Sequence, residues 1–193
     1  MLEYTKEATK KNVEVLNPNI KLSTDEFEVI NGKIYFPLSI IKGLGEIKTK
    51  QCIEERTKVQ FKGYEDFVER TKDFLAISLL ENIIYSGALD DFGLTKKAMI
   101  ENLKSIIDRS NYGFIKDMIK TDYTDEEFSY GILQEKELEV IGINIKYNFY
   151  QQFASFYSKY NLVKIANLSE NKEARTIGTV KRVRETKTKN NET

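Results

Sequence analysis

The segment IKGLGEIKTKQCIEER, residues 41 to 56, constrains the fold more than any other part of the chain. An apolar stretch leads into the corner Gly43-Leu44-Gly45, and a second helical pattern follows it. Because glycine lacks a Cβ, Gly43 and Gly45 can adopt positive φ and leave the main chain open to a close neighbour. Leu44, between them, is expected to point into the core. The pattern therefore predicts two helices joined by a tight turn.

Two interpretations of this corner stay open. It suits a helix-hairpin-helix, a motif whose main-chain N–H groups usually hold a phosphate of a nucleic acid. It also suits an ordinary corner between two helices, in which the glycines only end or cap a helix. The residues of the corner alone do not decide between a nucleic-acid contact and a purely structural turn.

Length and composition exclude several classes of protein. The chain has 193 residues, of which 40% are hydrophobic and 31% charged, so it can form one domain or two small ones. No apolar run reaches the roughly 20 residues that span a bilayer, and residues 1–12 lack the apolar stretch of a secretory signal. Cys52 is the single cysteine and histidine is absent, which excludes an internal disulfide, the usual zinc sites and histidine-based triads. We expect a cytoplasmic protein without a membrane partner.

The formal net charge is zero, but the charges are unevenly distributed. Basic residues surround the glycine corner and crowd the C-terminal end, whereas the middle of the chain is acidic. A solvated surface explains any one of these clusters as readily as a ligand does. The clusters are, around the corner, Lys42, Lys48, Lys50, Arg56 and Lys58; at the C-terminal end, Arg175, Lys181, Arg182, Arg184, Lys187 and Lys189; and, in the middle, Asp122, Asp125, Glu126, Glu127, Glu135, Glu137 and Glu139.

A small β-hairpin is predicted ahead of the corner. Residues 3–12 suit a short polar helix, and the segment VEVLNPNI that follows is expected to be extended. Asn31-Gly32 is the commonest two-residue hairpin turn, and apolar residues flank it on both sides, which predicts a hairpin over residues 26–36. Pro37 then ends the strand and suits the first turn of a helix that leads to the glycine corner.

Helical patterns continue to about residue 111 and contain a second corner. Ile47, Cys52 and Ile53 are the apolar positions of the helix after the first corner, with Cys52 as a small core residue. The corner Ser86-Gly87-Ala88-Leu89 later interrupts the pattern, and Thr95 is placed to cap the next helix. The two corners lie about 45 residues apart, so they can pack as a pseudo-symmetric pair that grips successive phosphates along a duplex. The other predicted apolar positions are Tyr64, Phe67, Val68, Ile77, Leu80, Ile83, Ile84, Ala98, Met99, Leu103, Ile106 and Ile107.

The rest of the chain changes in character. Periodicity fades and acidic residues accumulate from residue 110 to residue 131, which predicts a surface loop, and structure resumes near Leu133. Residues 175–188 suit one or two strands that begin a new domain. Because the returning strand of that hairpin is missing, we expect the chain to be a fragment of a longer protein. An aromatic stripe with helical spacing indicates a packing face rather than a base-stacking platform; it consists of Phe149, Phe153, Phe156, Tyr157 and Tyr160.

Taken in order, these pieces resemble the alpha subunits of bacterial DNA polymerase III, the C family of replicative polymerases. The end of the fingers region of that family is similar to the segment YTKEATKKNVEVLNPNI. Its first helix-hairpin-helix is similar to the segment FPLSIIKGLGEIKTKQCIEER. FKGYEDFVERT resembles the connecting helix, LLENIIYSGALDDFG the second hairpin, and ELEVIG the helix that follows. VKIANLSE and ARTIGTVKRVRETKTKNNE resemble the beginning of its OB-fold. The ordered set is more specific than any single motif.

The resemblance implies a mainly α fold with a small β-hairpin near the N-terminus, a tandem helix-hairpin-helix and the first strands of an incomplete OB-fold. The implied segments are residues 1–37, the end of a fingers-like region; 38–110, the tandem hairpins; 111–132, an acidic linker; 133–173, a helical connector; and 174–193, the truncated OB-fold.

The resemblance also implies a non-catalytic role in DNA replication, in which the chain holds primer–template duplex by contacts with the backbone that are independent of sequence. The parent would be a DNA-directed DNA polymerase that uses magnesium, whereas this fragment would need no cofactor, metal site or catalytic residue. The implied partners are duplex DNA, the sliding clamp and other replisome subunits. The implied DNA-binding residues are Gly43, Leu44, Gly45, Glu46, Lys48 and Lys50 of the first hairpin, and Gly87, Ala88, Leu89, Lys96 and Lys97 of the second.

The chain also departs from the family pattern. The catalytic carboxylates of the family precede this region and nothing here resembles their Asp-x-Asp setting, so the chain alone is not expected to synthesise DNA. The family's short clamp-binding peptide has no clear counterpart between Ile107 and Gln134, since Tyr112–Met118 and Phe128–Ile132 fit it poorly. KYNFY, residues 146–150, replaces the turn that usually follows the ELEVIG-like helix, so the local path is expected to differ.

Two other functions stay open. DNA glycosylases also carry a helix-hairpin-helix and place an acidic residue some 20 positions after it, close to where Asp66 lies. An acidic residue near a helix start is usually explained by its favourable interaction with the helix dipole. A protein-interaction module would instead use the acidic linker and the aromatic helix to contact the clamp or its loader.

Overall fold

The computed structural model describes residues 7–8, 11, 13–109, 121–148 and 153–178. Its contacts divide the chain into two units, Met1–Asn148 and Phe149–Thr193, each of which we describe by itself. The first unit holds the sheet and both corners. The finer division at residues 37, 110, 132 and 173 stays a prediction, because two units defined by contacts do not test it.

A three-stranded sheet precedes the first corner, in the order β1–β3–β2. β2 (Glu28–Ile30) and β3 (Lys33–Tyr35) pair antiparallel, and Asn31 and Gly32 in the turn have φ of 52° and 75°, which confirms the predicted hairpin. β1 (Val15–Leu16) pairs with β3 in parallel. The predicted extended segment is thus a third strand, which the sequence did not reveal because its partner lies far along the chain.

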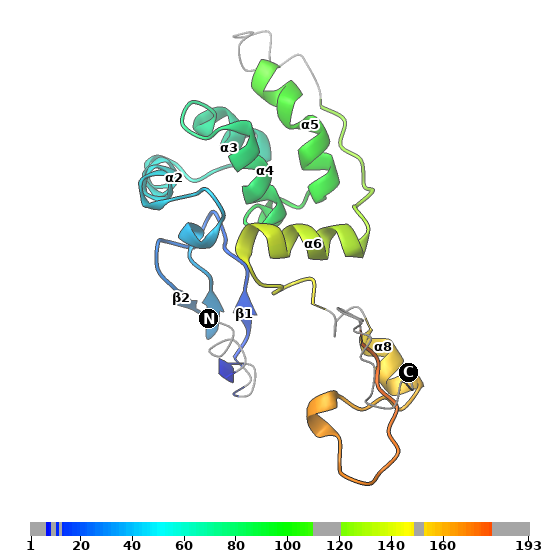
Figure 1. Cartoon of the computed structure of the whole chain (residues 1–193). Helices are drawn as coiled ribbons and strands as arrows, with labels where there is room; N and C mark the ends of the chain where they lie inside the picture. Colours follow the sequence, from blue (N-terminus) through cyan, green and yellow to red (C-terminus); the bar gives the residue numbers. More distant parts are fainter. Residues whose placement is uncertain (1–6, 9–10, 12, 110–120, 149–152, 179–193) are drawn as a thin grey trace, which may run out of the picture. The chain divides into compact units, whose positions relative to one another are not determined.

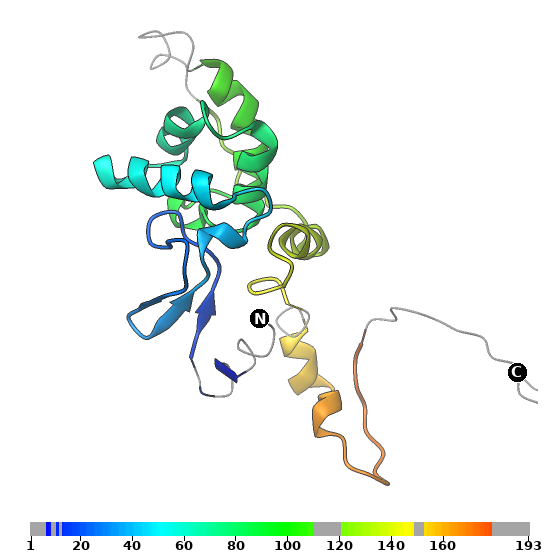
Figure 2. The ribbon, with the colours of Figure 1, turned by 60° about the vertical axis from the view of Figure 1, so that its left-hand side comes forward.

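Helices form most of the first unit. They are η1 (Leu38–Ile40), α2 (Glu46–Lys58), α3 (Tyr64–Thr71), α4 (Ile77–Tyr85), η2 (Asp90–Phe92), α5 (Lys96–Arg109) and α6 (Tyr130–Ile141). α5 packs against α3 and α4, α6 packs against α4, and α2 packs against α3 and η1 (Figure 1). In Figure 2, α2 crosses the helical group close to the sheet. The helix predicted after Pro37 is only one 3-10 turn, because Ile41 is already extended, with φ −67° and ψ 124°.

The predicted apolar positions form most of the core. Those of α3 are all buried, as are most of those of α4 and α5. Cys52 is 1% exposed, and burial raises the pKa of its thiol to about 12, in agreement with its prediction as a small core residue. Ile47, in contrast, is 77% exposed in the first turn of α2, so its prediction as a core position is wrong.

The inner face of α2 also carries Arg56, which is 8% exposed. Its Nη1 donates to the main-chain oxygens of Ile20 and Ser23, both at 2.8 Å. Arg56 therefore points into the protein and ties the C-terminal half of α2 to the segment between β1 and β2. It was predicted as part of the basic cluster around the corner, and its charge is not available to a ligand there.

A buried carboxylate, that of Glu137 on α6, holds together three parts of the first unit. The side chain is fully buried and accepts hydrogen bonds from Asn17 Nδ2 at 2.7 Å and from Asn144 Nδ2 at 3.3 Å. It also accepts the main-chain N–H groups of residues 145, 146 and 147, at 3.0 to 3.1 Å. Asn17 Nδ2 in turn reaches the main-chain oxygen of Ser86 at 2.7 Å. The carboxylate thus fixes the start of KYNFY, where the path was predicted to differ from the family.

We predict that Glu137→Gln lowers the free energy of unfolding of the chain by at least about 2 kcal/mol, because an amide turns its own N–H groups toward buried donors and leaves them unsatisfied. Urea denaturation followed by circular dichroism measures the change. Glu135→Gln, an exposed carboxylate on the same helix, is the matched control and should shift stability by less than about 0.5 kcal/mol. Equal effects of the two substitutions would contradict the anchoring role.

The second unit contains α8 (Ala154–Lys159) and η4 (Ile165–Asn167). Phe156 and Tyr160 of the predicted aromatic stripe stack with ring centroids 5.7 Å apart and are 43% and 46% exposed, so this part of the stripe is not a buried packing face. Residues 174–178 form no strand, and residues 179–193 lie outside the described part of the chain. The OB-fold therefore stays a prediction. Among the described helices, none combines the length and the apolar character needed to cross a bilayer.

Candidate nucleic-acid interface

The first corner uses its two glycines differently. Gly43 is exposed and has φ +85°, the left-handed region that favours glycine. Gly45 has φ −62° and ψ 173°, an ordinary extended conformation, so the expectation of positive φ is wrong for this residue. A Cβ on Gly45 would meet nothing within 4 Å. The backbone conformation therefore requires a glycine at position 43. Neither backbone strain nor steric crowding requires one at position 45.

Leu44 anchors the corner to the core, as predicted from its place between the glycines. The residue has no exposed surface. Its N–H donates to the oxygen of Ile41 at 2.9 Å, and its own oxygen accepts the hydroxyl of Thr49 at 3.1 Å. The main chain of Leu44 is therefore engaged inside the protein, so this residue positions the corner and is not itself placed to contact DNA.

The N-terminal end of α2 is open. Gly45 occupies the N-cap position and has no side chain that could accept a hydrogen bond from the helix. The N–H of Thr49 closes the first turn onto the oxygen of Gly45 at 3.0 Å. Within the part of the chain that the structure describes, the N–H groups of Glu46, Ile47 and Lys48 meet no acceptor. These amides carry the partial positive charge of a helix start and suit an anion.

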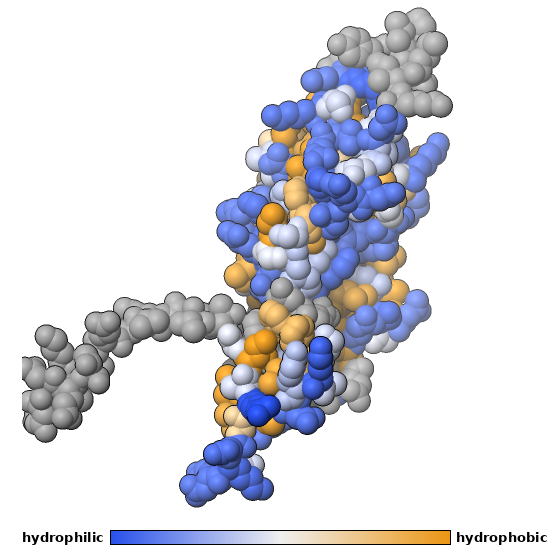
Figure 3. Space-filling model, turned by 90° about the vertical axis from the view of Figure 1, so that its right-hand side faces the viewer, coloured by the Kyte–Doolittle hydropathy of each residue, from blue (hydrophilic) through white to orange (hydrophobic). Residues whose placement is uncertain are grey.

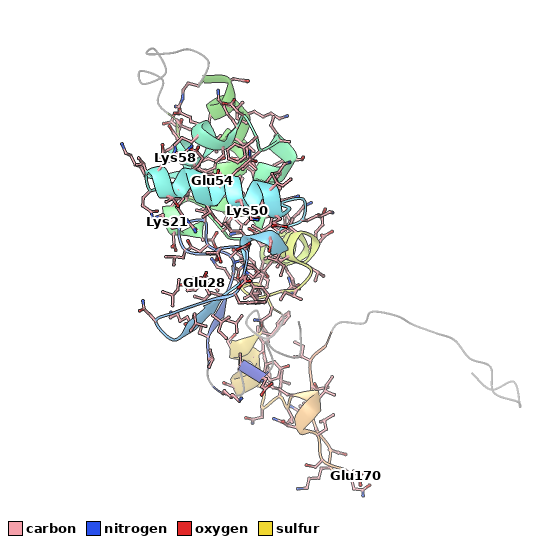
Figure 4. The ribbon with its side chains drawn as sticks, turned by 90° about the vertical axis from the view of Figure 1, so that its left-hand side faces the viewer. Lys21, Glu28, Lys50, Glu54, Lys58 and Glu170 are labelled. Atoms are coloured by element: carbon pink, nitrogen blue, oxygen red, sulfur yellow. The ribbon has the colours of Figure 1, made fainter. Side chains whose placement is uncertain are left out.

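Charged side chains surround this open end. Lys50 Nζ lies 2.6 Å from the carboxylate of Glu46, and their hydrogen bond lowers the pKa of Glu46 and raises the pKa of Lys50. Glu46 is thus partly neutralised and holds Lys50, but its own charge does not favour a phosphate. Lys48 is half-buried and forms no ion pair with any described residue. In Figure 4, Lys50, Glu54 and Lys58 lie along the length of α2.

Two neighbouring helices set the position of the first corner. The N–H of Lys42 donates to the oxygen of Val140 on α6 at 2.8 Å. The oxygen of Lys42 accepts Asn82 Nδ2 of α4 at 2.9 Å. The residue just before Gly43 is therefore held from both sides, and the open amides of α2 have a fixed direction relative to the helical group.

The two glycines should respond to substitution with opposite signs. We predict that Gly43→Ala lowers the free energy of unfolding by about 1–2 kcal/mol, because its φ is unfavourable for a residue with a Cβ. Gly45→Ser should raise it by up to about 1 kcal/mol, since a serine at the N-cap supplies the missing acceptor for a helix N–H. Urea denaturation of the two variants tests both signs; a stabilised Gly43→Ala or a strongly destabilised Gly45→Ser would contradict the geometry.

The second corner lies inside the protein. Gly87 has φ +84° and is buried, and Ala88 and Leu89 are at most 1% exposed. The N–H of Gly87 donates to the oxygen of Ile84 at 3.1 Å, and that of Ala88 to the hydroxyl of Ser86 at 3.2 Å. The predicted phosphate contacts at Gly87, Ala88 and Leu89 are therefore not presented to a ligand. These residues form internal contacts of the corner and are not part of the candidate interface.

The start of α5, unlike that of α2, is fully capped. Thr95 accepts the N–H of Ala98 at 3.1 Å, which confirms its predicted capping role. The carboxylate of Glu127 accepts the N–H of Lys96 at 2.9 Å and that of Lys97 at 3.0 Å. Sequence reasoning did not identify Glu127 beyond its place in an acidic stretch, because no local signal reports a contact across 30 positions.

The predicted basic residues of the second corner also have internal partners. Lys96 is 2% exposed and its Nζ pairs with Asp90. Lys97 pairs with Glu126 and lies 3.9 Å from Glu101. The hydrogen bond that Lys97 donates to the carboxylate of Glu126 raises the pKa of Lys97. Both lysines are therefore neutralised in this conformation, so the structure presents one open corner, the first.

Asp66, the acidic residue considered for a glycosylase, lies in the first turn of α3. Its carboxylate accepts the N–H of Lys62 at 2.9 Å and lies 3.5 Å from Arg70 Nη1. These contacts explain the residue as part of a helix start and an ion pair. Over the described residues, no group of three acidic or cysteine side chains is placed to hold a metal ion.

Comparisons with known proteins are consistent with this geometry. Residues 12–99 match a protein-family model described as a helix-hairpin-helix motif. The chain is 32% identical over 199 residues to a DNA polymerase III subunit alpha of Helicobacter pylori strain J99, covering 86% of the chain. Proteins of the same name match in Deinococcus radiodurans, at 38% over 108 residues and 55% of the chain, and in Campylobacter jejuni, at 27% over 215 residues and 97% of the chain.

The chain spans only a small part of these relatives. It covers 16% of the Helicobacter protein, 8% of the Deinococcus protein and 18% of the Campylobacter protein. The similarity therefore concerns one segment of a much longer protein, and that segment contains the helix-hairpin-helix match.

Proposed function

Because the chain belongs to the family of the DNA polymerase III alpha subunits and matches one segment of these proteins, we propose that it holds duplex DNA by the sugar–phosphate backbone at the start of α2. The observation that carries the proposal is the row of N–H groups at Glu46, Ile47 and Lys48, which have no acceptor among the described residues. A helix start with free amides is a ready site for a phosphate.

The chemistry of this end favours a backbone contact that is independent of base sequence. Phosphate oxygens accept main-chain N–H groups at any base pair, and contacts with phosphates carry no sequence information. The bare Cα of Gly45 leaves the approach to these amides clear. Lys48 adds a positive charge in the same turn, without an internal partner among the described residues. We assign the chain a gripping role on primer–template duplex during replication.

The proposal gives the chain no catalytic step. We assign nucleotide transfer, and the magnesium ions that it would use, to parts of a parent polymerase that the chain does not span. The discriminating measurement is therefore DNA binding by the chain itself.

We predict weak duplex binding with a marked salt dependence, because each phosphate contact that releases a counterion lowers the logarithm of the binding constant by about 0.9 per logarithm of salt. Fluorescence anisotropy of a labelled duplex, titrated with the full chain at two or more salt concentrations, gives this slope. Lys48→Gln should flatten the slope by about 0.9. Lys104→Gln, an equal loss of charge at an exposed position of α5, should leave the slope nearly unchanged and is the matched control. Absence of binding by the folded chain would remove the proposal.

Gly45→Ser provides a second test that is independent of side-chain charge. The serine hydroxyl would occupy an amide of α2 and place a Cβ in the approach path, so we predict that the dissociation constant for duplex rises by about tenfold, the equivalent of one lost charge-assisted hydrogen bond. Anisotropy at one salt concentration measures it. The variant should be at least as stable as the parent, so a loss of binding cannot be ascribed to unfolding; unchanged affinity would place the phosphate elsewhere.

A protein-interaction role is the second candidate, and the described residues give it little support. Phe128, part of the nearest stretch to a clamp-binding peptide, packs on Tyr85 with ring centroids 6.0 Å apart, so it is already used inside the unit. The other stretch, Tyr112–Met118, lies outside the described residues. A pull-down with the sliding clamp, run beside the DNA titration, separates the two roles.

A further inference from the structure

The segment of residues 121–128, here called the acidic strap, lies over the start of α5 and carries three consecutive carboxylates. Glu127 bridges the N–H groups of Lys96 and Lys97, at 2.9 and 3.0 Å, with one carboxylate oxygen on each. Two oxygens of one anion on two successive amides of a helix start is the arrangement that a phosphate would adopt at the same place. In Figure 1 the strap runs beside α5, and Figure 3 shows that hydrophilic residues prevail on that side.

The contrast with α2 suggests what the strap does. Both helices follow a corner in the region that matches the helix-hairpin-helix model. The amides at the start of α2 meet no acceptor among the described residues, whereas those of α5 meet a carboxylate from a segment about 30 residues away. The strap also neutralises the side chain beside these amides, since Glu126 pairs with Lys97. It thus occupies both the amides and the cation that the second corner would offer to DNA.

The strap is anchored at both ends, and the side chains of its acidic tip are exposed. At one end, Tyr123 donates to Glu65 at 2.7 Å and Arg109 to the hydroxyl of Thr121 at 2.7 Å. At the other end, the ring of Phe128 packs on Tyr85. Between them, the side chain of Glu126 is 75% exposed and Glu127 is also exposed. The ion pair of Glu126 with Lys97 therefore contributes little to stability, about 0–1 kcal/mol, and salt weakens it. Glu127 is held by the main-chain N–H groups that it accepts.

We infer that the acidic strap is an internal competitor of DNA, which occupies the phosphate-binding end of α5 and must be displaced before the second corner can grip a duplex. The inference rests on the function proposed above and adds a regulatory device to it. The chain in this conformation grips with one corner; with the strap lifted, the amides of Lys96 and Lys97 and the side chain of Lys97 become available for a second phosphate.

The first test compares charge removal inside and beside the contact, by anisotropy with the same labelled duplex. The double variant Glu126→Gln/Glu127→Gln should bind about three- to tenfold more tightly than the parent and steepen the salt slope by about 0.9, the value of one added phosphate contact. Asp122→Asn/Asp125→Asn is the matched control, since it removes two charges from the same strap at exposed side chains with no described contact to α5. Binding of the double variant no tighter than that of the control would overturn the inference. Circular dichroism confirms that each variant is folded.

The second test follows the strap directly, by hydrogen exchange of the full chain with and without duplex. DNA should slow exchange at residues 45–48 and accelerate it at residues 121–128. Slowed exchange at α2 with an unchanged strap would overturn the inference and leave the proposed function standing. Absence of duplex binding by both the parent and the double variant would remove the proposed function and the inference together, so the two failures are distinguishable.

Discussion

The buried carboxylate of Glu137 is the interaction on which the arrangement of the first unit depends. It joins the residue that follows β1, the second corner and the loop after α6, by way of Asn17 and three successive main-chain N–H groups. A carboxyl group without exposed surface is tolerated only when its oxygens accept hydrogen bonds, and here both do. Since α6 also holds Lys42 through the oxygen of Val140, the carboxylate indirectly orients the first corner.

The starts of α2 and α5 differ in whether their first N–H groups have acceptors among the described residues. Main-chain polar groups in proteins are nearly always satisfied, and the exceptions call for an explanation. α5 satisfies its first amides with Thr95 and Glu127, whereas α2 has a glycine where a capping side chain usually stands. Because Gly45 is neither strained nor crowded, the fold itself does not explain the choice. The proposed contact with a DNA phosphate would supply the missing acceptor.

The elements that could be predicted from the sequence are those with a local signal. Asn31-Gly32 predicted the hairpin, Thr95 the start of α5, and Leu44 the inward residue of the first corner. The failures are contacts between distant segments. β1 pairs with a strand about 20 residues away, and Ile47 is apolar but faces solvent, because the neighbours of a helix decide which face is covered.

The candidate site was predicted in part, for the same physical reason. The local pattern predicted the turn at the first corner, whereas the family resemblance assigned Lys96 and Lys97 to DNA binding. Whether a lysine is free or paired depends on Asp90 and Glu126, whose positions only the tertiary structure determines. The role of Glu127 was likewise invisible, since an acidic residue in an irregular stretch looks the same whether it caps a helix or faces water.

Arg56 has a consequence for how the open end of α2 works. Its bonds to the oxygens of Ile20 and Ser23 fasten the helix near its far end, while Lys42 and Leu44 fasten the near one. Because α2 is held near both ends, the N–H groups of its first turn keep their orientation before a ligand binds. Little conformational entropy is then lost when a ligand binds, so the contact with duplex DNA proposed above could form and release quickly.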